Sequence, residues 1–185
     1  MSSSRIRSLH ALRTSAAPPE PDYAGHFVNT LADCLALPPP QLRVNVWSDC
    51  AGTVSAMVTA AKITAAFEER FGKKIQFSLY AACDTNAARK KLIMTDRFPK
   101  HFADDIFHRD FVQGTFYCSR CTCHGLTPTK GIDIYVCCFP CSPWSAMGKR
   151  LGFNESVAGV VWQAIRTIRH MESCFYCFEN VLSLD

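Results

Sequence analysis

Apolar runs of strand length alternate with helical patterns along the chain, and this alternation constrains the fold more than any other feature. Strands are predicted at residues 42–47, 75–82, 132–138 and 174–178, and helices at residues 54–70, 85–94 and 156–170. Such alternation is typical of a parallel sheet covered by helices on both faces. The sequence therefore predicts an α/β fold with a doubly wound, mainly parallel sheet, whose functional edge lies at the carboxyl ends of the strands.

The first 41 residues differ in composition from the rest of the chain. They contain a serine run at residues 2–4, three arginines and several clustered prolines. We expect a flexible leader over residues 1–41 and one folded domain over residues 42–185. The arginine-containing, acid-poor start is also compatible with organellar targeting, which the sequence leaves open.

The overall composition fits a globular protein and excludes several classes. Hydrophobic residues make up 48% of the chain, but no run approaches the roughly 20 apolar residues of a membrane helix. A soluble nuclear or cytoplasmic protein is therefore expected. The net charge of +4 permits contact with nucleic acid without predicting it. The 11 cysteines are an odd number in a chain of this length, so reduced thiols are expected rather than a disulfide framework.

A loop rich in proline and glycine follows the third predicted strand and begins with Pro140 and Cys141. A thiol held in a loop just past a buried strand is well placed to act as a nucleophile. Taken alone, Cys141 is explained more simply as a structural cysteine, so its interpretation depends on the surrounding residues.

Those surroundings closely resemble the catalytic-loop signature of the cytosine-5 DNA methyltransferases. The resemblance rests on the run from Asp133 to Cys141 and on Trp144, Ser145, Gly148, Lys149, Gly152 and Phe153. After one further helix and strand, residues 178–181 (Phe-Glu-Asn-Val) resemble the Glu-Asn-Val motif of the same family. The resemblance implies a Rossmann-like, partial class I methyltransferase fold. It also implies transfer of a methyl group from S-adenosylmethionine to C5 of cytosine.

The same resemblance implies a role for each catalytic residue. Cys141 would add to C6 of cytosine, because a thiolate at C6 pushes electron density toward the otherwise unreactive C5. The Glu179 carboxyl would engage N3 and the exocyclic amine of the base. Asn180 would brace the loop that contains Pro140 and Cys141.

Three more segments resemble the cofactor-binding motifs of the family: Cys50, Ala51 and Gly52 after the first strand, Asp84 after the second, and Asp105 with Ile106. A glycine in the first strand-to-helix turn lets the backbone approach a cofactor closely. The resemblance implies that Asp105 accepts a hydrogen bond from the adenine amine. Ala82 stands where the family has a ribose-binding acid, so Asp84 is the candidate for that role.

The resemblance stops before the target-reading half of the family. The chain ends at Asp185, so we expect a partner chain or a further segment to supply target recognition for DNA. Two alternatives stay open. One is a catalytically inactive remnant that binds cofactor, zinc or nucleic acid, and the other is an enzyme that methylates cytosine in RNA, such as tRNA.

A cysteine and histidine cluster lies between the cofactor and catalytic motifs. Its members are Cys118, Cys121, Cys123 and His124. These side chains are zinc ligands in many proteins, but structural sites usually draw ligand pairs from separate turns. Four ligands within seven residues make a single tetrahedral site awkward, so we predict no metal site and leave zinc open.

Overall fold

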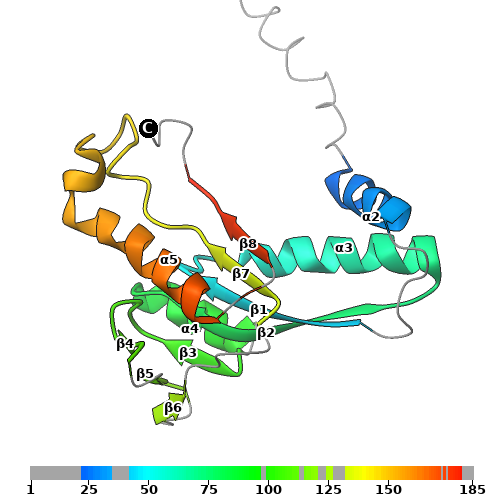
Figure 1. Cartoon of the computed structure of the whole chain (residues 1–185), viewed down its shortest axis with the longest axis horizontal. Helices are drawn as coiled ribbons and strands as arrows, with labels where there is room; N and C mark the ends of the chain where they lie inside the picture. The colour runs from blue at the N-terminus through cyan, green and yellow to red at the C-terminus, as the bar shows by residue number, and fades with distance from the viewer. Residues whose placement is uncertain are drawn as a thin grey trace, which may run out of the picture.

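The computed structural model describes residues 22–34, 42–96, 99–112, 115–120, 124–126, 132–171, 173 and 175–180. Its centre is a five-stranded sheet in which all neighbouring strands are parallel, in the order β3-β2-β1-β7-β8 (Figure 1). The strands are β1 (Leu42–Asp49), β2 (Ile75–Cys83), β3 (His101–Ala103), β7 (Ile134–Cys137) and β8 (Phe175–Phe178). The order reverses between β1 and β7, which confirms the predicted doubly wound sheet.

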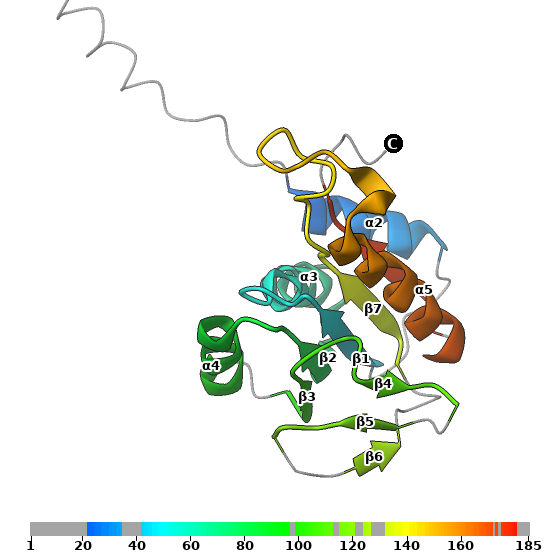
Figure 2. The same cartoon turned by 90° about the vertical axis from the view of Figure 1, so that its left-hand side faces the viewer.

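Helices cover both faces of this sheet. Helices α3 (Ser55–Phe71) and α4 (Ala87–Asp96) lie on one side and α5 (Gly159–Met171) lies on the other, as Figure 2 shows. Neighbouring residues of β1 accordingly enter different cores. Val46 belongs to the core that contains Phe67 of α3, whereas Trp47 belongs to the core that contains Ala164 of α5. The sequence predicted β1 from the apolar residues Leu42, Val44, Val46 and Trp47 within it.

The segment before α5 differs from its prediction. A helix is predicted from residue 156, but α5 begins at Gly159 and is preceded by two short 3-10 turns, Gly152–Asn154 and Ser156–Ala158. Within the described ranges, no helix combines the length and the apolar character that would let it cross a membrane.

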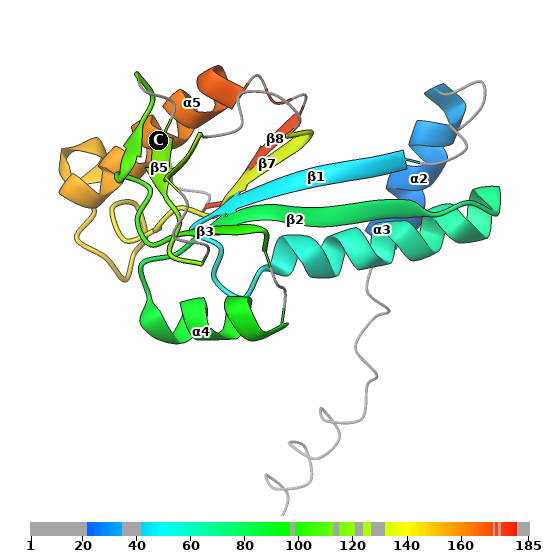
Figure 3. The same cartoon turned by 90° about the horizontal axis from the view of Figure 1, so that it is seen from below.

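Helix α2 (Tyr23–Cys34) lies inside the range for which the sequence predicts a flexible leader. It packs against the C-terminal part of α3, as Figure 3 shows, and Val28 is buried there. The clustered prolines on both sides of residues 22–34 dominate the composition of the range, which is why the sequence pattern did not reveal this helix.

A small antiparallel sheet follows β3, with the order β4-β5-β6. Its strands are β4 (Arg109–Asp110), β5 (Thr115–Tyr117) and β6 (His124–Leu126), none of which was predicted. Phe116 of β5 fixes this sheet to the main one, because its ring packs edge-on against Trp47 at a centroid distance of 5.4 Å.

A buried ion pair also joins the two sheets. Asp49, at the end of β1, pairs with Arg109 of β4, and both side chains are fully buried. The Tyr135 hydroxyl donates a hydrogen bond to Asp49 Oδ2 (2.5 Å), and the Trp47 indole donates one to Oδ1 (2.9 Å). Burial alone lowers the pKa of Arg109, but the adjacent Asp49 carboxylate outweighs it and raises that pKa. Each buried charge therefore has its partner, as low-polarity surroundings require.

Candidate active site

The turn after β1 forms the first wall of the candidate site and has an unusual backbone. Cys50, Gly52 and Val54 all have positive φ angles, of 49°, 56° and 57°. Positive φ is uncommon for residues other than glycine and is unfavourable for a β-branched residue such as Val54. Hydrogen bonds hold the turn in place, because the Ala51 amide donates to the carbonyl of Cys83 (3.0 Å) and the Gly52 amide donates to Asp84 Oδ2 (2.8 Å).

Asp84 joins this turn to the one that follows β2. Its side chain is buried, and its Oδ1 accepts a hydrogen bond from the Asn86 amide at 2.9 Å. The Arg89 guanidinium lies 3.8 Å from Oδ2. Asp84 thus organises both loops on the β1 and β2 side of the sheet edge, which we call the β1/β2 wall.

The second wall, which we call the β7/β8 wall, is the loop after β7 together with the end of β8. The Asn180 side-chain amide donates to the carbonyl of Phe139 at 3.0 Å, so it holds the backbone just before Pro140. The Cys141 carbonyl accepts hydrogen bonds from two later amides of its own loop (3.0 and 2.8 Å), and the Cys141 side chain is exposed. Gly148 closes the loop so tightly that an added Cβ would lie 1.8 Å from the carbonyl oxygen of Ser142.

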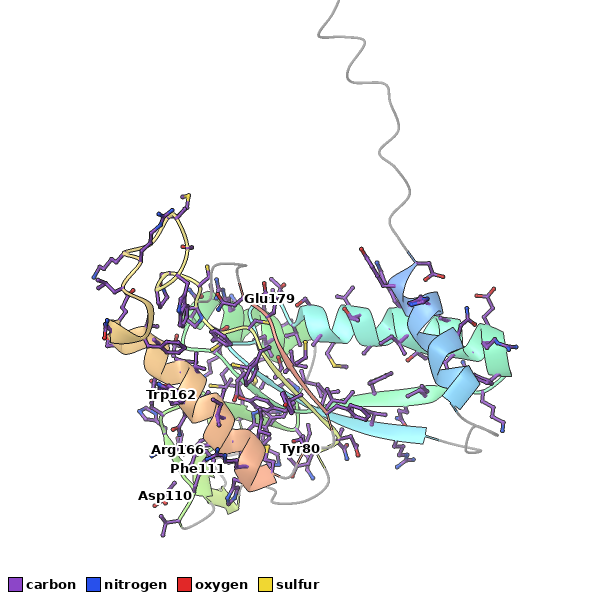
Figure 4. All side chains as sticks on the ribbon, turned by 45° about the horizontal axis from the view of Figure 1, so that its top comes forward. Tyr80, Asp110, Phe111, Trp162, Arg166 and Glu179 are labelled. Carbon is purple, nitrogen blue, oxygen red and sulfur yellow. The ribbon has the colours of Figure 1, made fainter. Side chains whose placement is uncertain are left out.

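A cavity of about 420 Å³ lies between the two walls. Six of the sequence-predicted site residues line it: Cys50, Asp84, Asp105, Ile106, Pro140 and Cys141. The other four, Ala51, Gly52, Glu179 and Asn180, are not part of its lining. The predicted cofactor segments and the predicted nucleophile therefore face one cavity, whereas Glu179 is exposed at the end of β8, where Figure 4 labels it.

The segment after β3 also lines the cavity, through Asp105, Ile106 and Phe107. Asp105 Oδ1 accepts a hydrogen bond from the Phe107 amide (2.9 Å), which fixes the carboxylate at the start of a turn. Ile106 is buried beside it. The pair combines an acceptor with an apolar surface, as recognition of a flat, amine-bearing ring requires.

The thiols around the cavity differ in their readiness to ionise. Burial raises the pKa of Cys83. A hydrogen bond with the Cys50 side chain, together with burial, raises that of Cys137. Burial and the nearby Glu179 carboxylate raise the pKa of Cys138 to about 11. These three groups stay protonated near neutral pH and are poor nucleophiles. Cys141 differs from them in accessibility, since it is the exposed cysteine of the cavity lining.

Several cavity residues were not predicted from the sequence: Cys83, Thr85, Arg89, Phe107, Cys138, Ser142, Val157 and Val160. The position of Cys83 and Cys138 at the ends of predicted strands was the available signal. The contributions of residues 157 and 160 depend on how α5 packs, which no local pattern reveals. Asp49 was not predicted either, because its pairing with Arg109 depends on how distant segments pack.

The cysteine and histidine cluster lies largely outside the described residues. Cys121 and Cys123 belong to a part of the chain that the structure does not describe, and the side chain of His124 is not described either. Cys118 is buried, and its sulfur accepts a hydrogen bond from the Phe102 amide at 3.4 Å. Among described side chains, no three potential metal ligands are grouped around one point.

Comparison with known proteins adds independent support for the catalytic motifs. The sequence profile of the C-5 cytosine-specific DNA methylase family matches residues 100–185. No curated protein matches the chain. The matched range contains Asp105, Cys141, Glu179 and Asn180, whereas the turn after β1 lies outside it. Members of this family transfer methyl groups to cytosine. The match to the C-5 cytosine-specific DNA methylase family therefore covers residues 100–185, which include the whole β7/β8 wall.

Proposed function

We propose that the chain carries the catalytic and cofactor-binding half of an S-adenosylmethionine-dependent enzyme that methylates C5 of cytosine in DNA. The observation that supports this most directly is the shared cavity. An exposed thiol, Cys141, lies on one wall, and the carboxylates of Asp84 and Asp105 lie on the opposite side. The nucleophile and the cofactor would then meet across one space.

The cavity suits a ligand of this kind. Its volume of about 420 Å³ falls within the roughly 300–1,000 Å³ of small-molecule sites. Asp105 would accept a hydrogen bond from the adenine amine, with Ile106 against the ring. Asp84 would accept from the ribose hydroxyls, since each of its oxygens keeps a lone pair after its bond to the backbone. S-adenosylmethionine would supply an electrophilic methyl group when bound.

The residues of the β7/β8 wall would perform the chemistry on cytosine. The Cys141 thiolate would form a bond to C6, while Glu179 donates a hydrogen bond or a proton at N3, so that electron density moves to C5. C5 would then take the methyl group. Removal of the C5 proton by a base would restore the C5–C6 double bond and release the Cys141 thiolate. Asn180 would keep the loop in position through the carbonyl of Phe139.

We also expect a partner chain or a further polypeptide segment to cover β8 and to read the target. β8 is the edge strand of the sheet, and its aromatic residues Phe175 and Tyr176, which are neighbours in the strand, are 70% and 63% exposed. Strands of a parallel sheet are normally buried on both faces. Covering β8 would also remove Glu179 from contact with solvent.

The exposure of Glu179 favours one second candidate function, a module that binds the cofactor without catalysing transfer. In that case the cavity would serve binding alone. The two functions are separated by whether Cys141 becomes covalently attached to cytosine.

The test uses an oligodeoxynucleotide that contains 5-fluorocytosine, mixed with the chain and S-adenosylmethionine. Fluorine at C5 blocks the final elimination, so the Cys141–C6 bond persists and the adduct survives denaturing electrophoresis. We expect an adduct with the unmodified chain and with Cys177→Ala, which removes an exposed thiol outside the cavity lining. We expect no adduct with Cys141→Ala. An adduct that survives Cys141→Ala would exclude this nucleophile.

Calorimetry with S-adenosylmethionine separates the second candidate. Micromolar binding, equivalent to about −8 kcal/mol, that is lost in Asp105→Ala but is accompanied by no adduct would support the cofactor-binding module. An oligoribonucleotide with the same base identifies an RNA substrate if it alone is trapped.

A further inference from the structure

A series of four aromatic rings runs from the active-site loop to the surface of α5. Phe139 and Trp144 are buried at 3% and 4% exposure, whereas Phe153 and Trp162 are 51% and 57% exposed. Successive ring centroids lie 5.8, 5.3 and 5.6 Å apart. The series therefore joins the end of β7, next to the cavity, to an exposed tryptophan in the first turn of α5.

Positive charge accompanies this series. Residues 139–171 contain four basic side chains, Lys149, Arg150, Arg166 and Arg169, and a single acidic one, Glu155. All four basic side chains are exposed, and among the described residues none of them has an ion-pair or hydrogen-bond partner. Most of the net charge of the chain is thus concentrated in the segment that also holds the catalytic loop.

Trp162, Arg166 and Arg169 lie on one face of α5, because they are spaced by four and three residues. Figure 4 shows Trp162 and Arg166 in sequence along the outer side of the helix, with Phe111 and Asp110 beyond them. Basic residues in a last helical turn also stabilise the helix dipole, which accounts for Arg169. The helix dipole does not account for Arg166. It also does not account for Trp162, whose ring is 57% exposed and lies beside Phe153.

We propose that this surface, the α5 face (Phe153, Trp162, Arg166 and Arg169), binds a nucleic-acid strand. An unpaired base stacks on Trp162 beside Phe153, and the arginines contact the phosphates that follow. Aromatic rings beside unpaired cationic side chains are the combination that binds single strands. Trp162 and Arg166 are about 6 Å apart along the helix axis, so one base and its neighbouring phosphate can be contacted together.

The kind of partner in this inference rests on the proposed function, since a cytosine methyltransferase must hold the strand that carries its target. The α5 face would bind that strand outside the cavity, and its side chains would contact no reacting atom. An acidic protein is the other occupant that positive charge could attract, but it would not use the stacked rings.

The experiment measures binding of a labelled single-stranded deoxyoligonucleotide to the full chain by fluorescence anisotropy. Trp162→Ala should weaken binding about tenfold or more, because base stacking on an aromatic ring contributes about 1–3 kcal/mol. Arg166→Gln and Arg169→Gln should each lower the slope of log affinity against log salt by about 0.7. Tyr23→Ala and Lys91→Gln change an exposed aromatic and an exposed lysine elsewhere, and should leave binding unchanged.

Intrinsic fluorescence supplies a second measurement. Trp47 and Trp144 are 0% and 4% exposed, so Trp162 is the tryptophan that a base can reach. The oligonucleotide should quench the chain's fluorescence, and Trp162→Phe should remove the quenching while retaining most of the affinity. Unchanged affinity in Trp162→Ala, or equal competition by polyglutamate, would overturn the proposal. If the substitutions in the α5 face weaken binding as expected but the chain forms no adduct with 5-fluorocytosine, only the proposed function would be overturned.

Discussion

The two walls of the cavity are built in opposite ways. The β1/β2 wall is buried and cross-linked, with Asp49 in a fully buried ion pair and Asp84 hydrogen-bonded to two loops. The β7/β8 wall presents Cys141 and Glu179 to solvent and is held at the backbone by Asn180. Under the proposed function, the difference implies a preformed cofactor side and a catalytic side that is completed only when a substrate or partner covers it. Substitutions in the β1/β2 wall should therefore lower the free energy of unfolding, whereas substitutions in the β7/β8 wall should lower the reaction rate.

The largest effect on stability is expected for Asp49→Ala. It leaves the Arg109 guanidinium buried without its carboxylate, which typically destabilises a protein by about 3–5 kcal/mol. Urea unfolding followed by circular dichroism measures the change. Asp104→Ala is the matched control, because Asp104 pairs with Lys90 and both side chains are over one-third exposed, so the loss should stay below about 1 kcal/mol. Equal losses in the two variants would contradict the prediction that the buried pair stabilises the chain more than an exposed pair does.

Gly148→Ala should destabilise the chain less than Asp49→Ala does, but it should slow the reaction of Cys141 more. The new Cβ would collide with the Ser142 carbonyl, so the loop must shift and carry Cys141 with it. Overpacking costs about 1–3 kcal/mol, whereas a misplaced reacting group can slow a reaction about 100-fold. The rate of 5-fluorocytosine trapping measures the second effect. Gly159→Ala is the control, because its Cβ would lie 3.5 Å from the Phe107 ring, an ordinary contact, and trapping should be unchanged.

The smallest effect is a loss of stability in alkaline solution. The pKa of Cys138 is raised from 9.0 to about 11 in the folded chain, and those of Cys83 and Cys137 are raised as well. As the pH rises, these thiols therefore ionise in the unfolded chain before they ionise in the folded one. For Cys138, the contribution to stability is complete below pH 9 and is lost as the pH rises toward 11.

Urea midpoints at about pH 8 and about pH 10 test this prediction, and we expect a lower midpoint at the higher pH. Cys138→Ala should remove part of the decline, since it removes one of the shifted groups. A midpoint that is identical at both pH values would show that the buried thiols do not resist ionisation as described.

Local sequence patterns predicted most of the main sheet, because the strands β1, β2, β7 and β8 are rich in apolar residues. The predicted range 75–82 differs from β2 by one residue at its end. The segment from Arg109 to His124, in contrast, has two- and three-residue strands whose pairing depends on contacts with β1 and α5, so no periodicity could reveal it.

The candidate site was predictable to the extent that sheet topology gathers strand ends. Cys50, Asp84 and Cys141 come from three separate segments and line one cavity, as a parallel sheet requires. The roles of these residues stay predictions. The Asp49–Arg109 pair could not be foreseen, since the two residues are 60 positions apart and neither has a recognisable local motif. The aromatic series was equally hidden, because it needs the packing of the 139–158 loop on α5.

The strand order prevents residues 100–185 from forming the main sheet without the residues before them. The segment that matches the methylase family supplies β3 at one edge of the sheet and β7 and β8 at the other, while β1 and β2, which lie between them, come from residues before position 100. A fragment that begins at residue 100 would have two outer pieces of a sheet and no middle, and the Arg109 guanidinium would have no counter-charge. The family match and the folded unit therefore have different boundaries, because the matched residues 100–185 depend on β1 and β2 for the centre of their sheet.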